Sequence, residues 1–269
     1  MDPDTRLVEK SLRARHVHDE WESRYRTDRI ARFQDEQIDF VARRLGADDG
    51  TTVVDAGCGT ATNAIRLARR GVRVHAIDFS DAVLAQAREN VERAGVADLV
   101  RLERGDLLNL PLASAGVARL LVWGVLMHIP ELERAVGELS RVLAAGGRLV
   151  VCEGNVRSLD EVALRALDRL GRTTSAERKP AGMERWRETP GGPLLARRAD
   201  IGWLVGAFAR HGVVLRERLA CQLTEAYVYL PADSLLARAV HRLNAFWFHV
   251  VRSPRGASDV FLVFERPRA

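Results

Sequence analysis

The chain has 269 residues, of which 47% are hydrophobic and 29% charged, and its 41 basic and 36 acidic side chains give a net charge of +5. This composition excludes a disordered chain, a collagen-like repeat and a small disulfide-stabilised domain. The three cysteines are widely spaced in apolar surroundings, so neither a zinc cluster nor a disulfide framework is expected. No stretch reaches the roughly 20 apolar residues of a membrane span. We therefore expect a cytoplasmic protein without a membrane partner.

The basic side chains are almost all arginine. All but two of the 41 basic residues are arginines, a skew typical of a GC-rich bacterial genome. These arginines are dispersed and alternate with acids, as at Arg32, Asp35, Glu36 and Arg43. Such spacing is typical of a solvated helical face. It favours a protein with no nucleic-acid partner.

Strands and helices alternate through the first 153 residues. Apolar residues at helical spacing predict helices over 28–45, 61–70, 80–94 and 131–144. Short apolar and β-branched runs predict strands over 51–56, 72–77, 99–103, 117–123 and 147–153. Strands separated by helices form right-handed β-α-β units with a parallel sheet covered on both faces. The pattern therefore predicts a doubly wound α/β domain.

The pattern changes after residue 153. We expect helices over 158–170, 199–211 and 232–251, strands over 213–229 and 259–265, and a loop or lid over 171–193, where Gly, Pro and charge concentrate. This divides the chain into an N-terminal helical cap (1–46), a ligand-binding core (47–156), a helical and lid insertion (157–211) and C-terminal strands with an inserted aromatic helix (212–269).

A glycine-rich turn connects the first expected strand to the next helix. Gly57 and Gly59 allow a ligand to approach the backbone at a helix N-terminus. A dinucleotide fingerprint requires a third glycine, and Thr62 stands in that place. Asp55 would repel a pyrophosphate but attract a cationic amino-acid group. The turn therefore favours a cationic ligand, and an NAD-dependent dehydrogenase is the less favoured alternative.

Two further acids follow the next two strands. Asp78 can accept hydrogen bonds from both hydroxyls of a ribose, and Asp106 can accept one from an adenine amino group. The carboxyl ends of parallel strands meet at one edge of a sheet, where ligands of open α/β folds bind. The three acids together therefore indicate a nucleoside ligand that also carries a positive charge.

These residues resemble the motifs of the class I S-adenosylmethionine-dependent methyltransferases. Residues 55–60 resemble the motif that cradles the methionine part of the cofactor, residues 123–130 resemble the fourth motif, and residues 141–147 resemble the turn before the fifth strand. The resemblance covers about residues 50–153. It implies a Rossmann-like, seven-stranded, mostly parallel sheet with an antiparallel C-terminal hairpin, and S-adenosylmethionine as the cofactor. The cofactor-binding residues it implies are Asp55, Gly57, Cys58, Gly59, Asp78, Phe79, Asp106, Leu107 and Trp123.

Residues near the acceptor are predicted at the end of the fourth strand and, for the aromatic candidates, outside the core. His128, just past the fourth strand, is our candidate general base, with a positioning role as the alternative. Tyr25, Trp186 and Tyr227 are our candidate substrate-binding residues. No metal is expected, because Glu153 and Asn155 offer too few oxygen ligands.

The segment 172–198 carries seven basic and three acidic residues, which favours a solvated loop over a site for an anionic acceptor. The aromatic helix either closes the substrate cavity or pairs with a second copy of the chain.

The resemblance implies transfer of the sulfonium methyl of S-adenosylmethionine to oxygen, nitrogen or carbon of a small molecule, in bacterial secondary metabolism, by in-line displacement. Nucleic-acid acceptors are disfavoured, because the fourth strand is not followed by an Asn- or Asp-Pro-Pro-aromatic run and no cysteine follows a proline. The alternative from another class is a methyltransferase-like protein without catalytic activity that serves as an assembly partner.

Overall fold

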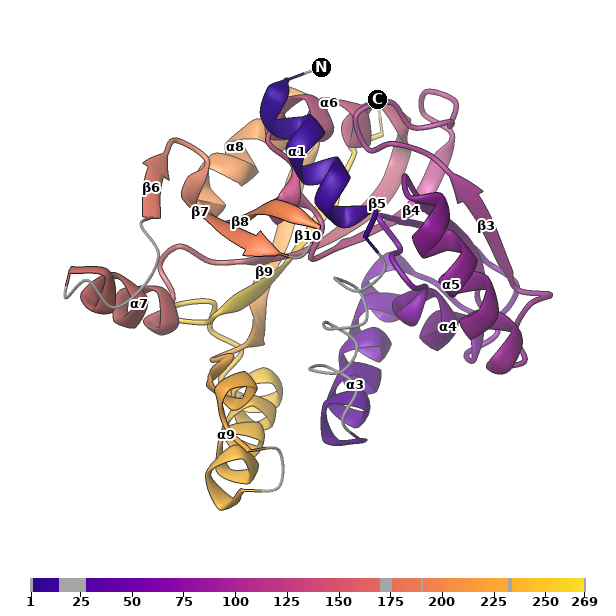
Figure 1. Cartoon of the computed structure of the whole chain (residues 1–269). Helices are drawn as coiled ribbons and strands as arrows, with labels where there is room; N and C mark the ends of the chain where they lie inside the picture. Colours follow the sequence, from indigo (N-terminus) through magenta and orange to yellow (C-terminus); the bar gives the residue numbers. More distant parts are fainter. Residues whose placement is uncertain (1, 15–27, 170–175, 190, 232–233, 269) are drawn as a thin grey trace.

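The computed structural model describes residues 2–14, 28–169, 176–189, 191–231 and 234–268, and its main body is a seven-stranded sheet between helices (Figure 1). The strand order is β3-β2-β1-β4-β5-β10-β9. β10 runs antiparallel to β5 and β9, whereas the other neighbours pair in parallel. The strands are β1 Thr52–Ala56, β2 Arg73–Asp78, β3 Val100–Arg104, β4 Val117–Trp123, β5 Leu143–Gly154, β9 Val214–Gln222 and β10 Asp259–Glu265. The predicted fold class is confirmed.

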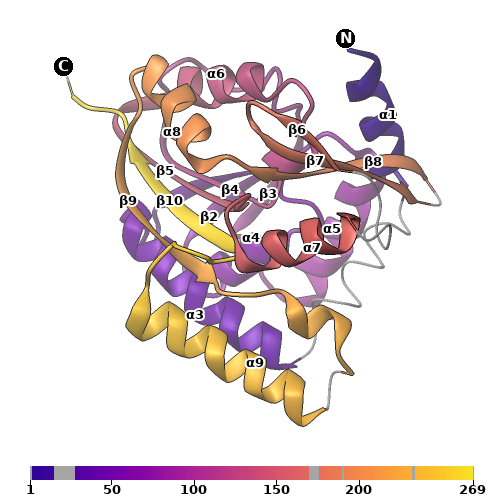
Figure 2. The same ribbon diagram turned by 90° about the vertical axis from the view of Figure 1, so that its left-hand side faces the viewer.

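Successive side chains along the strands point to opposite faces of the sheet and form two hydrophobic cores, one on each face. Leu120 and Val122 of β4 pack toward α6 and α8, whereas Leu121 packs toward α3, α4 and α5. Figure 2 shows α6 and α8 on one side of the sheet and α3 and α4 on the other. The helices on the two faces are α3 Asp28–Leu45, α4 Thr62–Ala68, α5 Asp81–Arg93, α6 Leu132–Val142 and α8 Ile201–Arg210.

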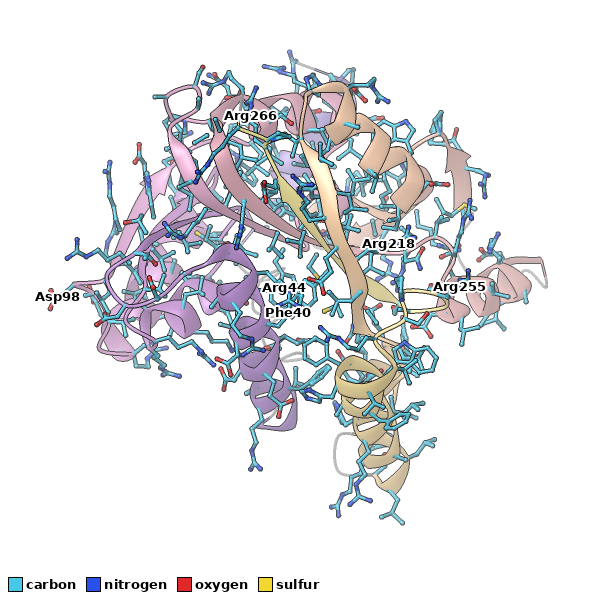
Figure 3. All side chains as sticks on the ribbon, turned by 180° about the vertical axis from the view of Figure 1, so that it is seen from behind. Phe40, Arg44, Asp98, Arg218, Arg255 and Arg266 are labelled. Atoms are coloured by element: carbon cyan, nitrogen blue, oxygen red, sulfur yellow. The ribbon has the colours of Figure 1, made fainter. Side chains whose placement is uncertain are left out.

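The helix α3 packs against the strands β9 and β10 at one edge of the sheet. The Phe40 ring lies 5.3 Å from that of Phe261 on β10, and the Arg44 guanidinium lies 4.7 Å from the Phe40 ring while pairing with Glu217 of β9 (Figure 3). Within the part of the chain that the structure describes, no helix is both long and apolar enough to span a bilayer.

The insertion contains a second sheet that we did not predict. Over residues 171–193 we expected a loop; the structure has an antiparallel sheet of β6 Ala176–Lys179, β7 Gly182–Thr189 and β8 Gly192–Ala199, preceded by α7 Leu159–Arg169. The sequence of β7 does not show the alternation of apolar and polar residues that predicts a strand, because one of its inward positions is Arg185. This arginine is buried in ion pairs with Glu161 and Asp168. A buried arginine paired with two acids uses the same residue types as a solvated loop, so the sequence alone does not distinguish the two.

The strand predicted over 213–229 is shorter in the structure. β9 ends at Gln222 instead of residue 229, and the short helix η2 Ala226–Tyr229 follows it. The side-chain Oδ1 of Asn244 accepts hydrogen bonds from the Leu223 and Thr224 N–H groups at 3.0 and 3.1 Å, which replaces sheet pairing there. The predicted aromatic helix is confirmed as α9 Leu235–Phe246, continued by the π-helix η3 Trp247–Val251.

The N-terminal helix α1 Pro3–Leu12 lies over the small sheet (Figure 1). Val8 packs on Leu194 and Leu195 of β8, and the Ser11 hydroxyl donates to the Pro193 carbonyl at 2.8 Å. The α1 helix is therefore attached to β8, beside the carboxyl edge of the large sheet.

Candidate active site

A cavity of about 330 Å³ lies between α1 and the carboxyl ends of the parallel strands. Its walls come from α1, from the turns after β1 and β2, from the segment after β3 and from the segment after β4. Its lining residues are Thr5, Val8, Glu9, Leu12, Gln34, Gly57, Cys58, Gly59, Thr60, Thr62, Asn63, Asp78, Phe79, Asp106, Leu107, Leu108, Trp123, Gly124, Val125, His128, Ile129 and Pro130. The edge predicted to bind a ligand therefore carries a cavity.

The glycine turn after β1 forms one wall. The Gly57 and Cys58 N–H groups donate to the Ile77 carbonyl of β2 at 2.8 and 3.0 Å, which fixes the turn. Gly57 has φ +81°, and a Cβ there would meet Val125 Cγ2 at 2.5 Å. A Cβ at Gly59 would have no protein atom within 4 Å. The turn therefore needs glycine at Gly57 for close packing and leaves open space at Gly59.

Asp55 lies at the end of β1, behind this turn, and of the predicted cofactor-binding residues it is the one that does not line the cavity. Its side chain is buried, and burial, reinforced by the charge of Asp78, raises its pKa to about 7. Its Oδ2 atom has no hydrogen-bond partner among the described residues. A buried carboxylate oxygen without a donor is costly, and a cationic or N–H group of a ligand would satisfy it.

Asp78 and Asp106 both line the cavity, as predicted. Asp78 Oδ2 accepts from the Gly59 N–H at 3.0 Å and Oδ1 from the Ser80 N–H at 3.1 Å, which joins the ends of β1 and β2. Asp106 Oδ1 accepts from the Leu108 N–H at 2.9 Å. Both carboxylates are thus held in fixed orientations at the cavity wall.

The remaining predicted cofactor residues, Cys58, Phe79, Leu107 and Trp123, also line the cavity. Trp123 is held edge-on against the Phe261 ring at 5.0 Å. Burial and then the nearby acid Asp78 raise the pKa of the Cys58 thiol well above its usual range. Cys58 is therefore a neutral wall residue and not a nucleophile.

His128 lies in the short helix η1 Leu126–His128 and lines the cavity with only 8% of its surface exposed. Its Nδ1 lies 2.6 Å from the carbonyl oxygen of Leu195 on β8. A carbonyl only accepts, so Nδ1 carries the proton in this contact and Nε2 of the neutral ring is the basic nitrogen. The geometry thus fixes one tautomer at the cavity wall.

Two residues that the sequence analysis did not assign to the site hold the η1 segment from opposite sides. Glu153, at the end of β5, accepts through Oε1 from the Val125 and Leu126 N–H groups at 3.1 and 2.8 Å. Arg197 of β8 donates to the Leu126 and Ile129 carbonyls at 3.2 and 2.7 Å and pairs with Glu184. We call Glu153 and Arg197 the η1 clamp. The one signal for it in the sequence is an acid, Glu153, at the end of an apolar strand.

The predicted substrate residues do not gather at the cavity. Tyr25 lies outside the described residues. Trp186 packs with Val8, Leu194 and Leu195 under α1 and is not part of the cavity wall. Tyr227 is buried in η2, where its hydroxyl donates to Gln222 at 3.2 Å and its ring stacks on His241 at 4.7 Å.

Three arginines of the insertion form ion pairs within the protein, whereas its other described charged residues of β6 and β7 are mainly exposed, namely Glu177, Arg178, Lys179, Arg187 and Glu188. Arg185 and Arg197 are paired as described above, and Arg198 pairs with Glu225. Over the described ranges there is no group of three or more His, Cys, Asp or Glu side chains suited to a metal ion.

Comparison with known proteins connects this site to methyltransferases. Residues 53–147 match the family described as a methyltransferase domain. Methyltransferase GfsG of Streptomyces halstedii is 32% identical over 145 residues, covering 53% of this chain and 52% of GfsG. The chain spans about half the length of the curated relatives it matches. The resemblance to the class I S-adenosylmethionine-dependent methyltransferases is thereby confirmed for this segment.

Solved structures show the same fold over nearly the whole chain. Magnesium protoporphyrin IX methyltransferase from Synechocystis PCC 6803 with bound S-adenosylhomocysteine is 16% identical with a TM-score of 0.62, covering 93% of this chain and 94% of that one. The [4+2]-cyclase SpnF is 21% identical with a TM-score of 0.58, covering 87% and 82%. The fold is therefore shared with proteins of different reactions, and the function has to be argued from the site.

Proposed function

We propose that the chain binds S-adenosylmethionine in this cavity and transfers its methyl group to a small-molecule acceptor. The observation that carries the proposal is the position of Asp78 and Asp106 in one cavity wall with the glycine turn, and of the buried Asp55 at the end of β1 behind that turn. The bound cofactor supplies a methyl group on a sulfonium, already activated for displacement. The described residues fit it, because the open space at Gly59 and the unsatisfied Oδ2 of Asp55 suit a close, cationic ligand.

Each wall of the cavity has a separate role in this proposal. Asp55 and the glycine turn face the methionine part, Asp78 holds the ribose hydroxyls, and Asp106 receives the adenine amino group. Trp123, Phe79 and Leu107 pack on the apolar surfaces of the cofactor. Binding then mainly orients donor and acceptor and excludes water, which accounts for much of the rate enhancement of a reaction with an activated donor.

We infer an apolar acceptor that enters beside α1. Val8 and Leu12 of α1, with Ile129 and Pro130 after β4, supply apolar side chains to the cavity wall. Two acids of the wall, Asp78 and Asp106, lie at the end of β2 and just after β3, and the third, Glu9, lies on α1. His128 lies on the wall that continues to Ile129, so its Nε2 is placed to take a proton from an acceptor hydroxyl or amine. An acceptor carbon that is already nucleophilic would not need this base. The proposed acceptor atom is therefore oxygen, nitrogen or carbon, and we assign the reaction to bacterial secondary metabolism as part of the same proposal.

The test is calorimetric titration with S-adenosylhomocysteine and, separately, with NAD. We expect micromolar binding of the first and none of the second. Asp78→Ala should weaken binding about tenfold or more, because two fixed carboxylate acceptors are lost. Asp81→Ala is the matched control, since Asp81 lies three residues away with a side chain that is 66% exposed. Binding of NAD alone would support a dehydrogenase, and binding of neither would support the non-catalytic alternative.

Turnover is then tested with methyl-labelled S-adenosylmethionine and a panel of apolar hydroxylated, aminated and enolic acceptors. Transfer of label to one class of acceptor supports the proposed reaction. Binding of S-adenosylhomocysteine without transfer to any of them would support a protein that keeps the cofactor site for another purpose.

A further inference from the structure

The helix α9 carries an apolar stripe that faces away from the protein. Its exposed large side chains are Leu235 (81% exposed), Leu236 (59%), Leu243 (43%) and Phe246 (53%), and the stripe continues to Val250 (64%) on η3. At 3.6 residues per turn, the four residues on α9 fall within an arc of roughly 100°. Single exposed apolar residues are ordinary on protein surfaces, whereas a continuous stripe along a helix marks a contact surface.

The opposite face of the helix fixes it to the protein. Ala237, Asn244 and Phe248 are buried, and the Asn244 side chain also donates to the Thr224 carbonyl at 2.9 Å. The Phe248 ring makes edge contacts with Phe33 and Phe40 of α3 at 5.6 and 6.1 Å. The helix is thus held with its apolar stripe pointing outward.

The segment that carries the stripe has charge of one sign. Residues 234–258 contain four arginines, two histidines and no Asp or Glu, and Arg238 and Arg242 flank the edge of the stripe. His249, on the same edge, pairs with Glu36 of α3 at 2.9 Å, so the two arginines are the cations that this edge offers to a partner. A second copy of the chain would bring the same acid-free segment to the interface, with no carboxylate from it to pair these arginines. An apolar stripe beside arginines is typical of helices that lie in the headgroup region of an anionic bilayer.

The position of α9 suits contact with a plane. Figures 1 and 2 show α9 at the lower edge of the molecule in two views at right angles, and Figure 3 shows its side chains spreading outward from that edge. None of its residues lines the cavity, so the helix does not close the active site.

We propose that α9 docks the protein on anionic lipid surfaces, with the apolar stripe among the headgroups and acyl-chain ends and with Arg238 and Arg242 beside lipid phosphates. The sequence expectation of no membrane partner rested on the lack of a spanning segment, which an interfacial helix does not require. This docking is independent of the reaction that the cavity performs.

The test is co-sedimentation of the full chain with vesicles of phosphatidylcholine, with and without phosphatidylglycerol. We expect binding to the anionic vesicles that weakens as salt is added. Arg238→Glu with Arg242→Glu should lower the partition coefficient about tenfold or more, because each arginine near an anionic surface contributes to binding. Arg69→Glu with Arg88→Glu is the control with the same change in net charge, since Arg69 is exposed at the C-cap of α4 and Arg88 is exposed on α5.

The apolar contribution is tested by Leu236→Gln with Phe246→Gln, which should also reduce binding about tenfold. Val162→Gln with Leu167→Gln is the control, since these residues are exposed and apolar on α7, where Asp160 and Asp168 lie nearby in sequence. All four substitutions are at exposed sites, and thermal unfolding checks that the fold is kept.

Three results of the vesicle experiment would overturn the proposal: no binding to anionic vesicles, equal binding to neutral vesicles, or binding that the α9 variants leave unchanged. Light scattering in the absence of lipid measures the oligomeric state and so tests the alternative, in which a second copy of the chain covers the stripe. A dimer that the Leu236 and Phe246 variant converts to a monomer would assign the stripe to a second copy and refute docking on lipid.

Discussion

Glu153 of the η1 clamp is the residue whose substitution tests the architecture of the site most directly. The Glu153 side chain is 1% exposed and accepts from the Val125 and Leu126 N–H groups. In Glu153→Ala both amides lose their acceptor at a site that water does not reach. Each unsatisfied buried group costs about 1–3 kcal/mol, so for the two amides we expect the free energy of unfolding to fall by about 2–6 kcal/mol.

The matched variant Glu153→Gln should behave differently. Burial raises the pKa of Glu153 to about 8, although the two N–H donors and Arg197 oppose this shift, so the carboxyl group is mainly protonated at pH 7. Glutamine keeps the carbonyl acceptor and is neutral. We therefore expect its free energy of unfolding to lie within about 1 kcal/mol of the wild type, as for a swap that leaves the paired group in place.

The raised pKa of Glu153 also predicts how the free energy of unfolding depends on pH. Glu153 binds its proton more tightly in the folded state, so the stability it contributes is present below pH 4.5, its ordinary pKa, and is lost as the pH rises through about 8. Asp55 and Asp259, with pKa values raised to about 7, act in the same direction. Glu153→Gln should thus flatten, without abolishing, the loss of stability across this range.

The measurement is urea unfolding of the wild type, Glu153→Ala and Glu153→Gln at several pH values from 4.5 to 8, the range set by the ordinary and raised pKa values of Glu153. Equal destabilisation by alanine and glutamine at pH 7 would refute the reasoning. It would show that Glu153 is ionised and that its charge toward Arg197, instead of its hydrogen bonds to the backbone, holds η1.

Three further predictions concern the cavity. Gly57→Ala should destabilise the fold by about 1–3 kcal/mol more than Gly50→Ala in urea unfolding, since both have positive φ but only the Gly57 Cβ meets Val125; equal effects would mean that only backbone strain matters. Binding of S-adenosylhomocysteine just below pH 7 should release protons, because a cationic group lowers the raised pKa of Asp55, and titration in buffers of different ionisation enthalpy measures this; an unchanged release in Asp55→Asn would assign it elsewhere. His128→Ala should slow turnover at saturating cofactor about 100-fold if His128 is the base, and a near-normal rate would limit it to positioning.

The parts of the fold that depend on local pattern were predictable, and those that depend on distant partners were not. Asp55, Asp78 and Asp106 could be placed together because each ends a strand of a parallel sheet, whose carboxyl ends share one edge. The strand β7 was missed because Arg185 is neutralised by acids from α7, a contact that no local window contains.

The acceptor side of the site shows the same limit. Trp186 was chosen because it is aromatic and outside the core, yet its side chain packs under α1. Conversely, Glu153 and Arg197 lie 44 residues apart in sequence and meet only through the backbone of η1. Residues that act by holding other residues have no residue type or spacing of their own, so sequence alone does not identify them.

The strand β8 has a consequence for protein engineering. One strand binds α1 through Pro193 and Leu194 and orients the ring of His128 through Leu195. An α1 helix grafted from a relative to change acceptor selectivity would pack on β8, the strand that also orients the His128 ring. Such a chimera should therefore exchange α1 and β8 as one module, because replacing the helix alone would alter selectivity and proton transfer together.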